Sequence, residues 1–151
     1  MNILSTSQIQ TNQPLLQTET MSPFWEIKVL LVETNSSVIR MVEKIMEDSS
    51  VLHFLRRIDN VHDLNFELKY NKPNVIISGR TMEGFDAISV LDQTHLYAPN
   101  MPVIVLAPDF NAPLNISLVN HGAYDIIYHT EIKRLANEVA FLYKAGLQKM
   151  A

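Results

Sequence analysis

The sequence predicts an α/β protein in which five parallel strands form one doubly wound sheet with helices on both faces. Three observations support this fold class. Short apolar runs rich in valine, isoleucine and leucine recur five times after residue 26. These runs are apolar at almost every position, as in strands that are buried on both faces. Helical segments separate them, and such alternation implies right-handed crossovers between parallel strands.

The first two strands are predicted at Ile27–Val32 and Val51–Ile58. Polar residues interrupt the second run, which favours a position at the edge of the sheet. Asn35 or Ser36 offers an N-cap for the helix between these strands. The apolar side chains of that helix follow at helical spacing: Val38, Met41, Val42 and Ile45. A short helix is predicted next, at His62–Tyr70.

The third and fourth strands are predicted at Val75–Ser78 and Pro102–Ala107. Gly79–Gly84 is predicted as a loop, and the helix that follows it is marked by Phe85, Ile88 and Leu91. Since Pro108 directly follows the fourth apolar run, we expect that strand to end there.

The last part of the pattern contains two helices and the fifth strand. Pro113 is expected near the start of a short helix that Gly122 ends. Tyr124–Tyr128 is the fifth strand. Thr130 is expected to cap the last helix, one face of which carries Ile132, Leu135, Val139 and Leu142.

The composition favours one globular domain and excludes several classes of site. Among 151 residues, 47% are apolar and 19% are charged, so a core can form. The net charge of −4 argues against a nucleic-acid binder that depends on phosphate neutralisation. The absence of cysteine excludes disulfides, thiolate zinc sites, iron–sulfur clusters and cysteine nucleophiles.

Residues 1–24 differ in composition from the rest, and we expect a flexible polar N-terminal tail before a domain at 25–151. Glu19 is the only charged residue between Met1 and Pro23. The segment lacks the basic region and apolar core of a secretory signal. No run in the chain approaches the roughly 18 apolar residues of a membrane span. We therefore expect a cytoplasmic protein without a membrane partner.

Five stretches have an order and spacing typical of one known family: Val29–Glu33, Pro73–Gly79, Met82–Asp86, Pro102–Leu106 and Gly122–Asp125. On these stretches, the chain from about Ile27 to Leu147 resembles the receiver domain of two-component response regulators. The resemblance implies a CheY-like, flavodoxin-like fold with strand order 2-1-3-4-5.

The chemistry of that family is phosphorylation of an aspartate. Two acids after the first strand hold Mg²⁺, the aspartate ends the third strand, and a hydroxyl and a lysine bind the phosphoryl group. This sequence departs from the pattern at these positions. It has Glu33 and Thr34 at the acidic pair, Gly79 at the acceptor, Ala107 at the hydroxyl, His129 at the lysine and Ile126 at the switch aromatic. The resemblance implies a degenerate pseudo-receiver, and we expect no metal or cofactor.

Two features of the emptied pocket leave alternatives open. Glu33 and His129 should both face it, either as an ion pair, which would raise the histidine pKa and lower the glutamate pKa, or as a solvated pair. Thr34–Ser37 opens a helix whose N-terminus could bind phosphate. Because the loop has no glycine, helix capping is the better explanation there.

The helix at Pro113–His121 predicts an interaction surface. Leu114, Leu118 and His121 can face the sheet, which leaves Ile116 and Val119 to meet water. In receivers this helix, the fifth strand and the last helix form the usual partner surface. Aromatic anchors could come from Tyr124, Tyr128, Tyr143 and Phe141, although core packing is the other reading of Phe141.

Two functions follow from these observations. The first is a stand-alone pseudo-receiver that works as a phosphorylation-independent interaction module in signal transduction. Its partner would be a sensor kinase, a regulator, an output protein or a second copy of the chain. The alternative is a small-ligand or cofactor binder that uses the emptied pocket at Thr34, Gly79 and Ala107. No nucleophile–base pair supports an enzyme.

Overall fold

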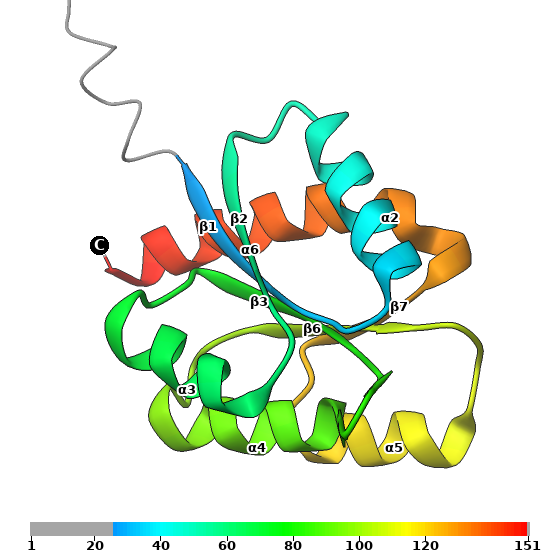
Figure 1. The fold of residues 1–151 in the computed structure, drawn as a ribbon. Coiled ribbons are helices and arrows are strands. Elements are labelled where there is room, and N and C mark those ends of the chain that lie inside the picture. The colour runs from blue at the N-terminus through cyan, green and yellow to red at the C-terminus, as the bar shows by residue number, and fades with distance from the viewer. Residues whose placement is uncertain (1–25, 151) are drawn as a thin grey trace, which may run out of the picture.

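The computed structural model describes residues 26–150, and in it the five predicted strands form one parallel sheet (Figure 1). The order is β2-β1-β3-β6-β7, which confirms the predicted order of the five parallel strands. These strands are β1 (Ile27–Val32), β2 (His53–Ile58), β3 (Val75–Gly79), β6 (Val103–Ala107) and β7 (Asp125–Tyr128). The boundary predicted at residues 24 and 25 lies outside the described part of the chain.

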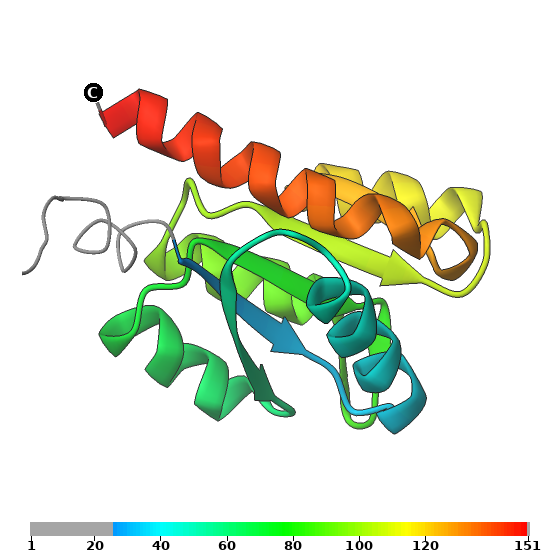
Figure 2. The same cartoon turned by 90° about the horizontal axis from the view of Figure 1, so that it is seen from above.

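Helices cover both faces of the sheet, as Figures 1 and 2 show. One face carries α2 (Ser36–Glu47) and α6 (Leu135–Met150), and the other carries α3 (Val61–Tyr70), α4 (Ala87–Tyr97) and α5 (Ala112–Asn120). Each face has its own apolar core. Val42, Met46 and Val139 belong to the first, whereas Leu64, Leu91 and Leu118 belong to the second.

Local sequence explains where the helices begin. An asparagine or aspartate in extended conformation precedes each of four helices, and its side chain accepts hydrogen bonds from the first-turn backbone, which stabilises the helix start. These N-caps are Asn35, Asn60, Asp86 and Asn111. Asn35 is one of the two caps expected. Gly122, with a positive φ of 97°, follows α5 as predicted.

The structure corrects two local predictions. The predicted loop at Gly79–Gly84 contains a short antiparallel hairpin, in which β4 (Thr81–Met82) pairs with β5 (Phe85–Asp86). Gly84 makes the tight turn possible through its φ of 90°. Thr130 is not the cap of α6, because it lies exposed inside a 3₁₀ helix, η3 (His129–Arg134), that leads into α6.

No helix within residues 26–150 is both long enough and apolar enough to cross a membrane.

Candidate functional site

The candidate site lies at the edge where the parallel strands end, and Glu33 is its most buried acid. This residue follows β1 and is only 5% exposed. Its Oε2 accepts hydrogen bonds from the backbone N–H groups of Thr34 at 2.9 Å and Asn35 at 3.0 Å. The carboxylate therefore folds back over the start of α2, where two otherwise unpaired amides stabilise it.

Gly79, the last residue of β3, lies directly against this carboxylate. A Cβ atom built on Gly79 would overlap Glu33 Oε1 and would lie 2.8 Å from Met82 Sδ. Real Cβ atoms do not approach so closely, so any residue larger than glycine must shift the ends of both the Glu33 and the Met82 side chains. The corner at the end of β3 is filled. The expectation of an emptied pocket is wrong at Gly79.

Thr34 ties the end of β1 to the hairpin. Its Oγ1 accepts a hydrogen bond from the backbone N–H of Glu83 at 3.0 Å. The structure thus brings together Glu33, Thr34 and Gly79, and Met82 and Glu83 of the predicted loop join them. These two contacts could not be predicted, because a hairpin of two-residue strands has no periodicity to detect.

Ala107 and His129 lie further along the sheet, at the ends of β6 and β7. Ala107 ends β6, is fully buried and lies opposite Tyr128 on the neighbouring strand. His129 opens η3 and is partly buried. Glu33 makes no ion pair with His129 in this structure, since its carboxylate binds the two backbone amides instead. The ion-pair alternative is therefore not supported.

Arg80 is a site residue that sequence reasoning missed. Its side chain is 12% exposed, and it binds Asp109 twice. Nη2 lies 2.9 Å from Asp109 Oδ1, and Nη1 donates to the Asp109 carbonyl oxygen at 2.9 Å. This contact, called here the Arg80–Asp109 tie, joins the ends of β3 and β6. Each residue follows a predicted strand by one or two positions, but no sequence pattern indicates that the two side chains are in contact.

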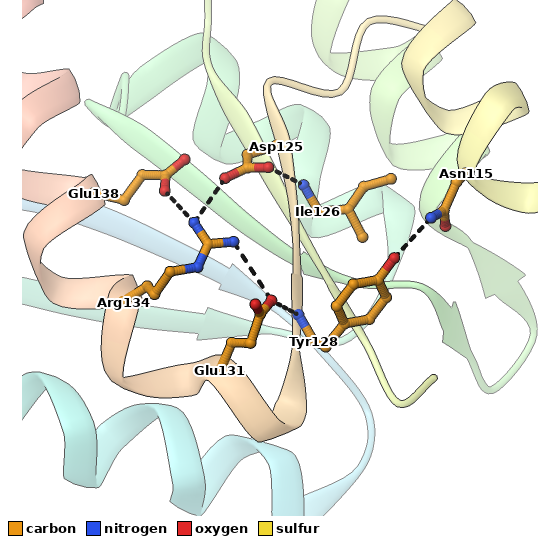
Figure 3. A network of polar contacts seen from close by, with 7 residues as sticks. All are labelled: Asn115, Asp125, Ile126, Tyr128, Glu131, Arg134 and Glu138. Atoms are coloured by element: carbon orange, nitrogen blue, oxygen red, sulfur yellow. Dashed lines mark hydrogen bonds and ion pairs between the residues drawn. The ribbon is translucent and has the colours of Figure 1, made fainter. Parts of the chain in front are cut away.

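Phe110 directly follows Asp109 of the Arg80–Asp109 tie, and this aromatic residue is 72% exposed. Its ring centroid lies 6.4 Å from that of Tyr128. The Tyr128 hydroxyl accepts a hydrogen bond from Asn115 Nδ2 on α5 at 2.8 Å (Figure 3). Ile126, at the switch position, is half-buried and packs against the second core. Side chains thus link the end of β3 to the surface of α5.

The outer face of α5 is apolar. Ile116 and Val119 are 63% and 60% exposed, which confirms that they meet water. Leu118 is buried as expected, but Leu114 is 38% exposed. His121 also differs from the prediction, because it is exposed and pairs with Asp92 at 2.8 Å. The buried stripe of α5 is therefore narrower than predicted.

The aromatic residues predicted as anchors differ in how exposed their side chains are. Tyr124 is half-exposed, and Phe141, for which core packing was one reading, is 62% exposed. Tyr143 packs partly buried against the first core. It therefore contributes less to an exposed surface than Tyr124 and Phe141 do.

Arg134, the last residue of η3, contacts three carboxylates beside the edge strand β7 (Figure 3). It lies 3.3 Å from Asp125 and Glu138 and 3.6 Å from Glu131. Burial of the Glu138 carboxyl, a hydrogen bond with Asp125 and the negative charge of Asp125 raise the pKa of Glu138 from 4.5 to about 7. The positive charge of Arg134 acts in the opposite direction. Burial and the nearby Asp125 charge therefore favour the protonated form of Glu138 more in the folded state than in the unfolded chain.

We expect the free energy of unfolding to fall as pH rises from about 5 to about 8, in part because of Glu138. The folded state binds this proton more tightly than the unfolded state, so the stabilisation is complete at low pH and is lost as pH rises toward the folded-state pKa of about 7. Solvent and Arg134 reduce the effect to about 1 kcal/mol. Urea unfolding of the protein and its Glu138→Gln variant across this range measures it. An unchanged pH dependence in the variant would contradict the assignment to Glu138.

Comparison with known proteins gives the same fold. No protein-family model matches the chain. The signal receiver domain of a Luxo repressor protein of Vibrio parahaemolyticus is similar with a TM-score of 0.71 and 23% identity, over 83% of this chain and 96% of that one. The receiver domain of Francisella response regulator 1452 is similar with a TM-score of 0.70 and 22% identity, over 80% and 99%.

A curated relative points in the same direction. The C4-dicarboxylate transport transcriptional regulatory protein DctD of Pseudomonas aeruginosa is 24% identical over 111 residues. The match includes 71% of this chain and 24% of that protein, so the chain corresponds to about a quarter of its relative. Together these likenesses show the receiver fold of response regulators.

Proposed function

We propose that this receiver fold acts in signal transduction as a protein–protein interaction module that works without phosphorylation. The observation that carries the proposal is the filled corner at Gly79. Glu33 and Met82 occupy the space that an acceptor side chain would need. The partner would be a sensor kinase, a regulator, an output protein or a second copy of the chain, and we propose no enzymatic activity.

The neighbours of Gly79 do not replace an acceptor aspartate. Ser78 is fully buried, and its hydroxyl donates to the Gly79 carbonyl oxygen at 2.8 Å. Arg80 is engaged by Asp109. A carboxylate nucleophile next to bound cations is what phosphoryl transfer to a receiver requires. None of these three residues supplies one.

The magnesium site that the fold family implies does not fit the residues present. Magnesium prefers carboxylate and other oxygen ligands in octahedral geometry. The Glu33 carboxylate is bound to backbone amides, Thr34 offers a hydroxyl that already accepts from Glu83, and Gly79 offers no side chain. Within residues 26–150, no three acidic, histidine or cysteine side chains are grouped to hold a metal.

The protein should remain unlabelled after incubation with acetyl phosphate and Mg²⁺, because Gly79 has no carboxylate to attack phosphorus. Intact-mass spectrometry measures labelling, and a receiver domain that retains the aspartate is the positive control. An acid-labile, Mg²⁺-dependent mass increase that maps to the ends of β1 or β3 would refute the proposal.

A small-ligand binder is the second candidate, and one cavity favours it. A cavity of about 310 Å³ lies beside Glu33 and Thr34, and Arg57, Asp59 and Asp63 also line it. It opens between the ends of β1 and β2, and neither Gly79 nor Ala107 lines it. Native mass spectrometry of the purified protein would reveal a retained ligand as an added mass.

We place the partner surface on the outer face of α5 with Tyr124, Tyr128 and Phe141. Ile116→Glu or Val119→Glu should weaken self-association or partner capture severalfold, because each puts a charge into an apolar contact. Each change should cost under about 1 kcal/mol of stability, as exposed substitutions do. Phe66→Glu on α3, where the side chain is 53% exposed, is the matched control. Analytical ultracentrifugation and urea unfolding distinguish a lost contact from a lost fold.

A further inference from the structure

A groove opens at the opposite edge of the sheet, where the strands begin. It lies between the start of β1, the segment before β2 and the side of α6 from Asn137 to Leu147, and its volume is about 360 Å³. Its apolar walls come from all three elements: Ile27, Val51, Leu52, Ala140, Tyr143 and Leu147. Figure 2 shows the C-terminal end of α6 above the beginning of β1.

The groove leaves large apolar side chains in contact with water. Leu52 is 50% exposed and Leu147 is 38% exposed. The β1 and β2 sides of the groove are joined, since the backbone N–H of Ile27 donates to the Leu52 carbonyl oxygen at 3.0 Å. Covering an exposed leucine is favourable in proportion to the apolar area that is removed from water. An apolar side chain that reaches this groove would therefore stabilise the protein.

The chain itself supplies a suitable pair of side chains. Phe24 and Trp25 immediately precede the described residues, and Trp25 is two residues before Ile27, which lines the groove. Two residues of extended chain reach at most about 7 Å. We propose that Phe24 and Trp25 dock in this groove and clasp the start of β1 to the end of α6. Lys144, which also lines the groove, offers a cation to the indole ring.

A second groove near the start of β1 is a poorer fit. It lies on the α3 side of the sheet, has a volume of about 210 Å³ and is lined by Phe54, Arg56 and Glu67. These side chains already engage one another. Arg56 pairs with Glu67 at 3.2 Å and stacks over the Phe54 ring at 5.6 Å. An aromatic ring would have to compete with both contacts there, whereas among the described side chains that line the α6 groove only Lys144 is charged.

The fluorescence of Trp25 tests the proposal, because it is the only tryptophan of the chain. In the full-length protein, its emission should be blue-shifted relative to the urea-unfolded chain, and acrylamide should quench it severalfold less. Leu147→Glu should shift the emission to the red and restore most of the quenching. Leu96→Glu on α4, where the side chain is 69% exposed and lines neither groove, should change neither.

Three outcomes would overturn the docking. The first is a wild-type Trp25 that is quenched as readily as in urea. The second is a red shift caused by Phe54→Glu and not by Leu147→Glu, which would place the ring in the α3-side groove. The third is an emission that changes with protein concentration, which would identify a second copy as the occupant. Circular dichroism confirms that each variant is folded, and none of these readouts depends on phosphorylation or on the α5 surface.

Discussion

Gly79→Asp is expected to destabilise the fold by about 3–5 kcal/mol and to gain no phosphorylation. The new side chain would enter the space of the Glu33 carboxylate and of Met82. Overpacking in such a site costs about 1–3 kcal/mol. A second carboxylate beside the buried Glu33 adds charge repulsion without a cation to compensate it, and burying an unpaired charge is among the most costly single changes.

Urea unfolding of a short series separates the two causes. Gly79→Ala adds the Cβ without the charge and should cost about 1–3 kcal/mol. Combining Gly79→Asp with Glu33→Ala removes the overlap with Glu33 and the charge repulsion but keeps the contact with Met82, so the double variant should be more stable than Gly79→Asp alone. A Gly79→Asp protein as stable as the wild type would show that Glu33 moves aside freely, and the filled corner would no longer argue against an acceptor.

Asp109→Ala should cost about 2 kcal/mol, whereas Arg80→Met should cost less than about 1 kcal/mol. The two expected losses of stability differ because the two side chains differ in burial. The Arg80 side chain is 12% exposed and Asp109 is 68% exposed. Deleting the carboxylate leaves a mostly buried guanidinium without its ion partner, while methionine keeps the apolar stem and removes the charge altogether.

A double-mutant cycle tests this reasoning. Once Arg80 is methionine, the Asp109→Ala change should have little further effect on the free energy of unfolding. Loss of the tie should also alter the NMR signals of Phe110 and Tyr128, because Phe110 directly follows Asp109 and its ring lies beside that of Tyr128. Equal costs for the two single variants would show that the tie acts through its loop geometry and not through a buried charge.

The sheet was accessible to sequence reasoning because its signal is local. Most of the parallel strands are short apolar runs, and β3 and β6 are buried at every position. The N-caps could be predicted in part, because their contacts are also local: the Asn35 side chain accepts from amides two and three residues later. The hairpin of β4 and β5 was missed because each of its strands has only two residues.

The site was predictable in its residue types but not in its contacts. Gly79, Ala107 and Thr34 could be placed at strand ends from the alignment of motifs alone. That Glu33 fills the space beside Gly79 depends on a rotamer fixed by two backbone amides. The Arg80–Asp109 tie spans 29 positions in the chain, and no periodic pattern encodes such a pair. Contacts of this kind require the packed structure.

The buried side of α5 could not be predicted from its sequence, for a different reason. Its sequence places apolar residues all around the axis, so spacing alone cannot decide which side is buried. Leu118 is the one fully buried side chain of the helix, and Leu114, one turn earlier, is already 38% exposed. The short length of α5 and its position over the end of the sheet decide this, and both are properties of the fold as a whole.

The strand order also determines how the protein can assemble during synthesis. β1, β2 and β3 are adjacent in the sheet and leave the ribosome before β6 and β7, so these three strands can pair before the other two have emerged. The other edge of β3 then waits for β6, and every residue of β3 is buried in the finished fold. Until Val103–Ala107 has emerged, that apolar edge is open to pairing with other chains. We expect the nascent chain to be most prone to aggregation, and most dependent on chaperones, in this interval.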